Sequence, residues 1–228
     1  MILALKKIFK FFTYLLMGHK LNLTKISLVY NKMKTIYSNQ EIKQTGETVA
    51  IIRVGGNLGA GKTTVCKKLA EYLGYRYFNT GGVFREMAKE RGLTIEEFYS
   101  QIASETTLEK EVDNRQIELM TTGDNLIVEG RIAAFLPCSF KAVNIFLKVS
   151  EKEGVSRMLK REENKERSFE EVLNLSRRRV KEERTHYGAL YGIKDHLDER
   201  KYNIIIDTTC MSPEEAITAT IRAITPLL

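Results

Sequence analysis

The sequence predicts an α/β fold in which a five-stranded parallel sheet carries helices on both faces. Three observations support this prediction. Five short apolar runs are typical of strands that are buried on both faces. Segments with helical periodicity and with helix-capping residues separate these runs along the chain. The first run leads directly into a glycine-rich loop and then into an amphipathic helix.

The first strand is predicted at Val49–Val54, and a helix follows from about Lys62 to Leu73, where Gly74 is a stop signal. The stretch "YRYFN" then predicts a short second strand, and "GVFREMAKERG" predicts a helix that ends at Gly92. Thr94 and Glu97 form a capping box, so a helix over "IEEFYSQIAS" should begin there.

The second half continues the alternation. A helix is predicted over Leu108–Met120, and the charged stretch from Glu151 to Tyr191 should be helical, with a capping box at Ser168 and Glu171. Ser212, Pro213 and Glu215 predict the start of a closing helix. The remaining strands are predicted at Asn125–Gly130, Ala142–Val149 and Tyr202–Asp207.

The net charge of +7 is concentrated at the N-terminus. Residues 1–45 hold eight lysines and one acid, whereas residues 46–228 hold 28 basic and 28 acidic residues. The folded part is therefore neutral, and we expect no nucleic-acid partner for it. Three scattered cysteines without a CxxC pair suggest neither a disulfide framework nor a zinc site and fit a reducing cytoplasm.

Residues 1–45 form a basic, apolar leader that is too short and too charged to predict a transmembrane helix. We expect a disordered extension or a misassigned start, because Met17 and Met33 could each begin the protein. A helix lying on a membrane surface is the alternative interpretation.

The stretch from Gly56 to Thr63 fits the phosphate-loop pattern G-x-x-x-x-G-K-[ST]. Glycines let successive backbone N–H groups point at phosphate oxygens, and the following helix adds its positive end. Lys62 should reach the β- and γ-phosphates of ATP, and the Thr63 hydroxyl should occupy one position on Mg²⁺. The predicted nucleotide-binding residues are Gly56, Asn57, Leu58, Gly59, Ala60, Gly61, Lys62, Thr63 and Thr64.

Several motifs occur here in the order found in the archaeal-type cytidylate kinases, a branch of the nucleoside monophosphate kinases. They are "GNLGAGKTT", "NTGGVFREMAKERGLTIEEF", "EVDNRQ", "VEGR", "HYGALYGI" and "YNIIIDTT". The chain resembles this family from about Val49 to its C-terminus. The resemblance implies a P-loop NTPase fold at residues 46–228, with a helical monophosphate-binding insert at about 80–120 and a helical lid at about 155–190.

The implied reaction is transfer of the ATP γ-phosphoryl group to CMP or dCMP, in a monomeric cytoplasmic enzyme. The acceptor phosphate is already mostly ionised at neutral pH, so arginines rather than a general base should drive catalysis. Arg85 and Arg131 follow the second and third strands and match the arginines that hold the monophosphate in the family. Salt bridges on the surface are the alternative for both.

In the lid, acids interleave with arginines, so a solvated helical hairpin is the plainer interpretation. Arg157 and Arg161 are one turn apart and should share a helix face, and Arg179 matches the arginine that opens the later lid motif. We predict that Arg157, Arg161 and Arg179 act on the transferring group, together with Lys62 and Arg131.

Substrate and metal residues follow from the same motifs. The resemblance places Thr80 and Gly81 at the monophosphate, and Asp113 and Arg115 at the base, where ordinary helix charges are the alternative. Glu129 ends a strand near the expected Mg²⁺ and would hold a water bound to the metal, unless it pairs with Arg131 instead.

The chain departs from the family pattern at a few positions. Asn57 follows the first loop glycine where proline is usual, and Gly82 and Lys194 stand where aspartates are common. His186 falls where a second lid arginine is common. The alternative functions are another nucleoside monophosphate kinase such as adenylate kinase, or an ATPase of RNA or ribosome assembly that uses the basic leader.

Overall fold

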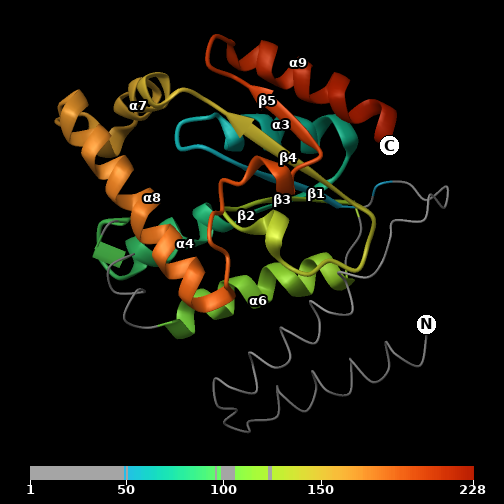
Figure 1. Cartoon of the computed structure of the whole chain (residues 1–228), viewed down its shortest axis with the longest axis horizontal. Coiled ribbons are helices and arrows are strands. Elements are labelled where there is room, and N and C mark those ends of the chain that lie inside the picture. Colours follow the sequence, from blue (N-terminus) through green and yellow to red (C-terminus); the bar gives the residue numbers. More distant parts are fainter. Residues whose placement is uncertain (1–48, 50, 96, 99–105, 123–124) are drawn as a thin grey trace, which may run out of the picture. The chain divides into compact units, whose positions relative to one another are not determined.

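The computed structural model describes residues 49, 51–95, 97–98, 106–122 and 125–228 (Figure 1). Within them lies a five-stranded sheet with helices on both sides, which confirms the predicted fold class. The strands are β1 (Ile51–Gly56), β2 (Arg76–Asn79), β3 (Leu126–Glu129), β4 (Ala142–Lys148) and β5 (Ile204–Asp207). The α-helices are α3 (Lys62–Leu73), α4 (Thr80–Glu90), α6 (Thr106–Thr122), α7 (Glu151–Leu159), α8 (Phe169–Tyr191) and α9 (Pro213–Ile224).

The sheet has the strand order β2-β3-β1-β4-β5, and each pair of neighbours runs parallel. The chain leaves β1 for one side of the sheet and later returns to the other side, so β1 lies at the point where the strand order reverses. Ligands of open parallel sheets bind in the crevice beyond the carboxyl ends of the strands at such a point. The loop after β1 therefore occupies the position where a ligand is expected.

Side chains on alternating residues divide the strands between two cores. Ile52, Val54 and Ile127 pack under α3 and α9, whereas Ile51 and Val128 pack under α6. All five side chains are fully buried. Strands buried on both faces become continuous apolar runs, which is why the sequence shows them so clearly.

Capping residues set several helix ends as predicted. The capping boxes at Ser168–Glu171 and at Ser212–Glu215 are both formed. Thr94 and Glu97 also exchange the predicted capping hydrogen bonds, although most of the helix that they should open lies outside the described residues.

The predictions for residues 1–45 also lie outside the described residues. Residues 1–44 and residues 45–228 are two separate units of the chain. In the described part of the chain, no helix is both long enough and apolar enough to span a bilayer.

Candidate nucleotide-binding site

The loop between β1 and α3 has the backbone that the glycine pattern predicts. Gly56, Gly59 and Gly61 have φ angles of 137°, 74° and 80°, a region that disfavours residues with a Cβ. Gly61 caps α3 without a side-chain hydrogen bond, and no acidic residue lies in the first turn of the helix. The free N–H groups and the positive end of the helix dipole are thus available to an anion.

Close packing fixes the loop on both sides. A Cβ at Gly59 would overlap the backbone of Gly154 in α7, and a Cβ at Gly154 would lie 2.6 Å from the Leu58 carbonyl oxygen. The Asn57 side chain accepts a hydrogen bond of 3.2 Å from the Val149 N–H. Asn57, which departs from the family pattern, therefore anchors the loop to the end of β4.

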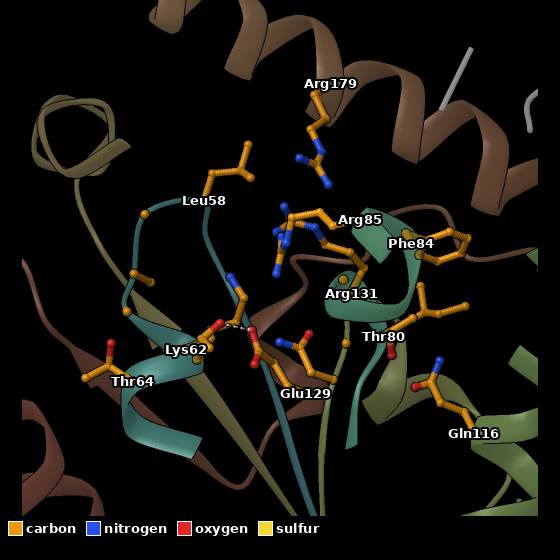
Figure 2. Close-up of a pocket in the computed structure, with 18 of the residues that line it drawn as sticks. Leu58, Lys62, Thr64, Thr80, Phe84, Arg85, Gln116, Glu129, Arg131 and Arg179 are labelled. Atoms are coloured by element: carbon orange, nitrogen blue, oxygen red, sulfur yellow. Dashed lines mark hydrogen bonds between the residues drawn. The ribbon is translucent and has the colours of Figure 1, made fainter. Parts of the chain in front are cut away.

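Lys62, the first residue of α3, holds its ammonium group inside the loop (Figure 2). It donates hydrogen bonds to the Gly56 and Asn57 carbonyl oxygens, at 3.0 and 2.6 Å. Burial, together with the positive charge of Arg131, lowers the pKa of Lys62 to about 7. A phosphate in the loop would add negative charge beside this buried cation and favour its charged form.

Thr63 and Glu129 meet at the carboxyl ends of β1 and β3. The Thr63 hydroxyl donates a 2.9 Å hydrogen bond to Glu129 Oε1, and the Tyr77 phenol donates to Glu129 Oε2. Glu129 is buried, and burial together with this hydrogen bond raises the pKa of Tyr77 far above its usual value. Arg131 does not pair with Glu129, so the alternative prediction for this carboxylate is wrong.

A cavity of about 410 Å³ opens beyond the loop and is lined by four arginines. Figure 2 shows Arg85, Arg131 and Arg179 with their guanidinium groups directed into it, and Arg161 is the fourth. Burial lowers the pKa of Arg161, and its charged neighbours Arg85, Arg179 and Arg131 lower it too. The loop residues that line the same cavity are Leu58, Gly59, Ala60, Gly61, Lys62, Thr63 and Thr64.

Two of these arginines share one buried carboxylate. Arg131 Nε lies 3.2 Å from Glu183 Oε1, and Arg179 Nε donates to the same oxygen at 2.9 Å. His196 Nε2 lies 3.2 Å from the other oxygen of Glu183, and the His196 side chain is fully buried. Burial alone would raise the pKa of Glu183, but the charges of Arg131 and Arg179 hold it well below the ordinary range.

The far end of the cavity combines polar and aromatic side chains, and Figure 2 shows Thr80, Phe84 and Gln116 there, across the cavity from Lys62. Asp113 also lines this end, accepting hydrogen bonds from Gln116 Nε2 at 3.2 Å and from the Tyr191 phenol at 2.6 Å. The Thr80 hydroxyl and Gln116 Oε1 are buried and have no hydrogen-bond partner among the residues that the structure describes. Such groups are costly to bury, which makes a bound polar ligand a natural partner.

Two predicted residues do not reach the cavity. Arg115 lies on the exposed face of α6 and pairs with Glu118 at 2.9 Å, with its side chain 63% exposed. Arg157 donates to the carbonyl oxygens of Thr208, Thr209 and Met211 in the loop after β5. Arg115 and Arg157 therefore contact other parts of the protein and do not line the cavity.

The shared helix face of Arg157 and Arg161 is a wrong prediction. Helix α7 ends at Leu159, and Arg161 caps the short 3₁₀ helix η2 (Glu162–Asn164) with an extended backbone. The four-residue spacing therefore spans a helix end, and the two side chains point to different places. Sequence reasoning also assigned no role to Tyr77 and His196.

Comparisons with known proteins agree with this geometry. The model of the cytidylate kinase-like family matches residues 51–210. The cytidylate kinase of Methanopyrus kandleri is 34% identical over 187 residues, covering 78% of this chain and 94% of that protein. The cytidylate kinase of Pyrococcus furiosus is 37% identical over 164 residues, covering 72% of this chain and 82% of that protein.

Among solved structures, the shikimate kinase of Acinetobacter baumannii in complex with shikimate aligns with a TM-score of 0.53. The alignment covers 79% of this chain and 95% of that chain at 21% identity, so it shows a common fold only. The family model and the curated relatives confirm the resemblance predicted from the motifs, and the chain belongs to the cytidylate kinase-like family.

Proposed function

We propose that this protein transfers the γ-phosphoryl group of ATP to CMP, and also to dCMP, to give ADP and CDP or dCDP. One observation carries the proposal beyond family membership. A single cavity joins the phosphate loop to four arginines and then to a polar pocket. A protein that only binds or hydrolyses ATP needs the loop, whereas a kinase needs a second anion-binding site beside it, as these arginines form.

The loop holds the donor. Its backbone N–H groups and the positive end of α3 bind the phosphates, and Lys62 reaches the β- and γ-phosphates from the position where it now contacts Gly56 and Asn57. Exchanging two carbonyl partners for phosphate oxygens lets the buried ammonium group remain charged.

Thr63 and Glu129 fit a magnesium ion. Their hydroxyl and carboxylate oxygens are the hard donors that Mg²⁺ prefers, and Thr63 Oγ1 and Glu129 Oε1 are only 2.9 Å apart. Bound Mg²⁺ would neutralise charge on the β- and γ-phosphates. In this proposal Thr63 supplies a direct ligand, and Glu129 holds a water of the ion's hydration shell.

The arginines hold the acceptor and stabilise the transfer. Arg85 and Arg131 bind the phosphate of CMP, and Arg161 and Arg179 neutralise charge on the group in transit. The acceptor phosphate has a second pKa of about 6, so it attacks without a general base. Positioning and charge are therefore sufficient for catalysis.

The acceptor's sugar and base would occupy the far end of the cavity. Thr80 and Gly81 lie at the start of α4 beside Arg85, and the buried Asp113 and Gln116 supply acceptor and donor groups for a base. We place the enzyme in the cytoplasm, where free thiols persist, because Cys66, Cys138 and Cys210 are unpaired. We propose that the enzyme is a monomer and that nucleotides are its ligands.

An acceptor panel tests the proposal. Purified protein with ATP and Mg²⁺ should release ADP rapidly with CMP and dCMP and slowly with AMP, UMP and GMP. Lys62→Ala protein from the same preparation controls for contaminating kinases. Rapid turnover of AMP without turnover of CMP would reassign the enzyme to adenylate kinases, and acceptor-independent ADP release would indicate an ATPase.

A further inference from the structure

Tyr77 in β2 lies beside Glu129, the carboxylate proposed for the metal site, although its position in the sequence suggests only a strand. The register pairs Tyr77 with Ile127 and Asn79 with Glu129, so Tyr77 and Glu129 project from the same face of adjacent strands. A diagonal neighbour on the same face is within reach of a long aromatic side chain. The Tyr77 phenol uses this reach and donates to Glu129 Oε2.

The two oxygens of Glu129 consequently have different partners. Oε2 accepts from Tyr77, while Oε1 accepts from Thr63 at 2.9 Å. The terminal torsion of a glutamate has a broad energy profile, so the carboxylate plane is not fixed by its own rotamer. A donor on Oε2 fixes that plane and leaves Oε1 at the Thr63 hydroxyl. Figure 2 shows the Glu129 carboxylate on the side of Lys62 and the phosphate loop.

We propose that Tyr77 is a positioning residue whose phenol orients Glu129 Oε1 toward the divalent cation of the ATP complex. The inference rests on the proposed function, because that function gives Thr63 and Glu129 their role at the metal. Outer-shell partners of metal ligands typically change metal affinity by about 10- to 100-fold when they are removed, and because Glu129 holds the ion through a water, we expect the lower end of this range for Tyr77. A purely structural phenol would stabilise the fold without changing metal affinity.

The test is Tyr77→Phe, which removes one hydroxyl and keeps the ring. Mn²⁺ binding to the full-length protein saturated with a non-hydrolysable ATP analogue is followed by the loss of the free Mn²⁺ electron paramagnetic resonance signal. We expect about tenfold weaker Mn²⁺ binding in the variant. Without metal, the affinity for the analogue should be unchanged, because the phosphate loop is intact.

Tyr75→Phe is the matched control. Its hydroxyl donates a 2.7 Å hydrogen bond to the Val49 carbonyl oxygen, at the opposite end of the sheet from Glu129. Tyr75→Phe removes the same hydroxyl group from a tyrosine two residues before Tyr77. We expect a comparable loss of thermal stability and unchanged Mn²⁺ affinity.

A double-mutant cycle with Glu129→Gln shows whether Tyr77 acts through the carboxylate. Tyr77→Phe should weaken Mn²⁺ binding in the wild-type background and have no further effect beside Glu129→Gln. Equal effects in both backgrounds, or a Tyr77→Phe protein that binds Mn²⁺ like Tyr75→Phe, would overturn the proposal. No acceptor is present in these titrations, so their result is independent of the outcome of the acceptor panel.

Discussion

The shared carboxylate of Glu183 offers a quantitative test of how the arginines are held. In Glu183→Gln the side chain keeps its size but loses its charge. Arg131 and Arg179 would then face each other across a neutral amide. Two cations that had a common counter-ion would repel, and both are partly removed from water, so we expect a substantial loss of stability.

Removing one partner of a buried ion pair costs about 3–5 kcal/mol. The side chains of Arg131 and Arg179 are 15% and 31% exposed, so solvent screening favours the lower end, about 3 kcal/mol. For a domain of this size, that loss lowers the melting temperature by about 6–12 °C. Urea unfolding gives the free energy directly, provided that the slope m is unchanged.

Glu182→Gln is the matched control, one residue earlier on α8. Glu182 lies 3.8 Å from Arg178, and both side chains are more than 60% exposed, so its loss should cost at most about 0.5 kcal/mol. If the two variants differed by less than about 0.5 kcal/mol, the argument for a buried shared charge would be refuted.

The pH dependence has a defined sign. The pKa of Glu183 is lowered on folding, so its contribution is present at neutral pH and is lost as the pH falls below the unfolded value of about 4.3. The stability difference between wild type and Glu183→Gln should therefore shrink on acidification, and a difference that grew would contradict the assignment.

Four further predictions concern the cavity and its supports. Lys62→Ala should lower kcat by at least about 100-fold in the ADP-release assay, because a charge on the transferring group loses its partner. Arg85→Ala should raise KM for CMP about 10- to 100-fold without changing the melting temperature, since Arg85 has no hydrogen-bond or ion-pair partner among the described residues. Arg157→Ala should instead lower the free energy of unfolding in urea by about 1–3 kcal/mol and leave KM for CMP unchanged. Gly59→Ala should abolish ATP binding in calorimetry, because φ is 74° and the new methyl group meets Gly154.

The phosphate loop could be predicted from the sequence because its requirements are local. Gly56, Gly59 and Gly61 take backbone angles that the glycine pattern demands, and the buried strand before them is visible as an apolar run. Arg131 could be placed for a topological reason. It follows a parallel strand, and the carboxyl ends of parallel strands meet at one edge of the sheet.

The direction of individual side chains on helices could not be predicted so well. Arg115 and Gln116 are neighbours on α6, and successive helical residues point about 100° apart, so only one of them can face the cavity. Which one does so depends on how α6 packs against the sheet. Arg157 and Arg161 were separated by a helix end at Leu159 that no capping signal announced.

Contacts between residues that are distant in sequence could not be predicted either. His196 lies 13 residues after Glu183, beyond the end of α8, and nothing in its surroundings marks it as buried beside a carboxylate. For Tyr77 the sequence gives a weak indication, because strand alternation places it on the same face as Asn79, which lies at the edge of the site. Its contact with Glu129 required the register of β2 against β3.

The close approach of Gly59 and Gly154 has a consequence for the lid that the sequence predicts at about 155–190. The backbone of the phosphate loop packs against α7, and Arg157 binds α7 to the loop after β5. Helix α7 therefore cannot move without moving the phosphate loop as well. Hinges absorb motion at residues that terminate elements, so we expect the lid to bend in the segment 160–168, between α7 and α8. Helix α7 would then stay in place with the phosphate loop, and we expect the lid motion to involve α8, which carries Arg179.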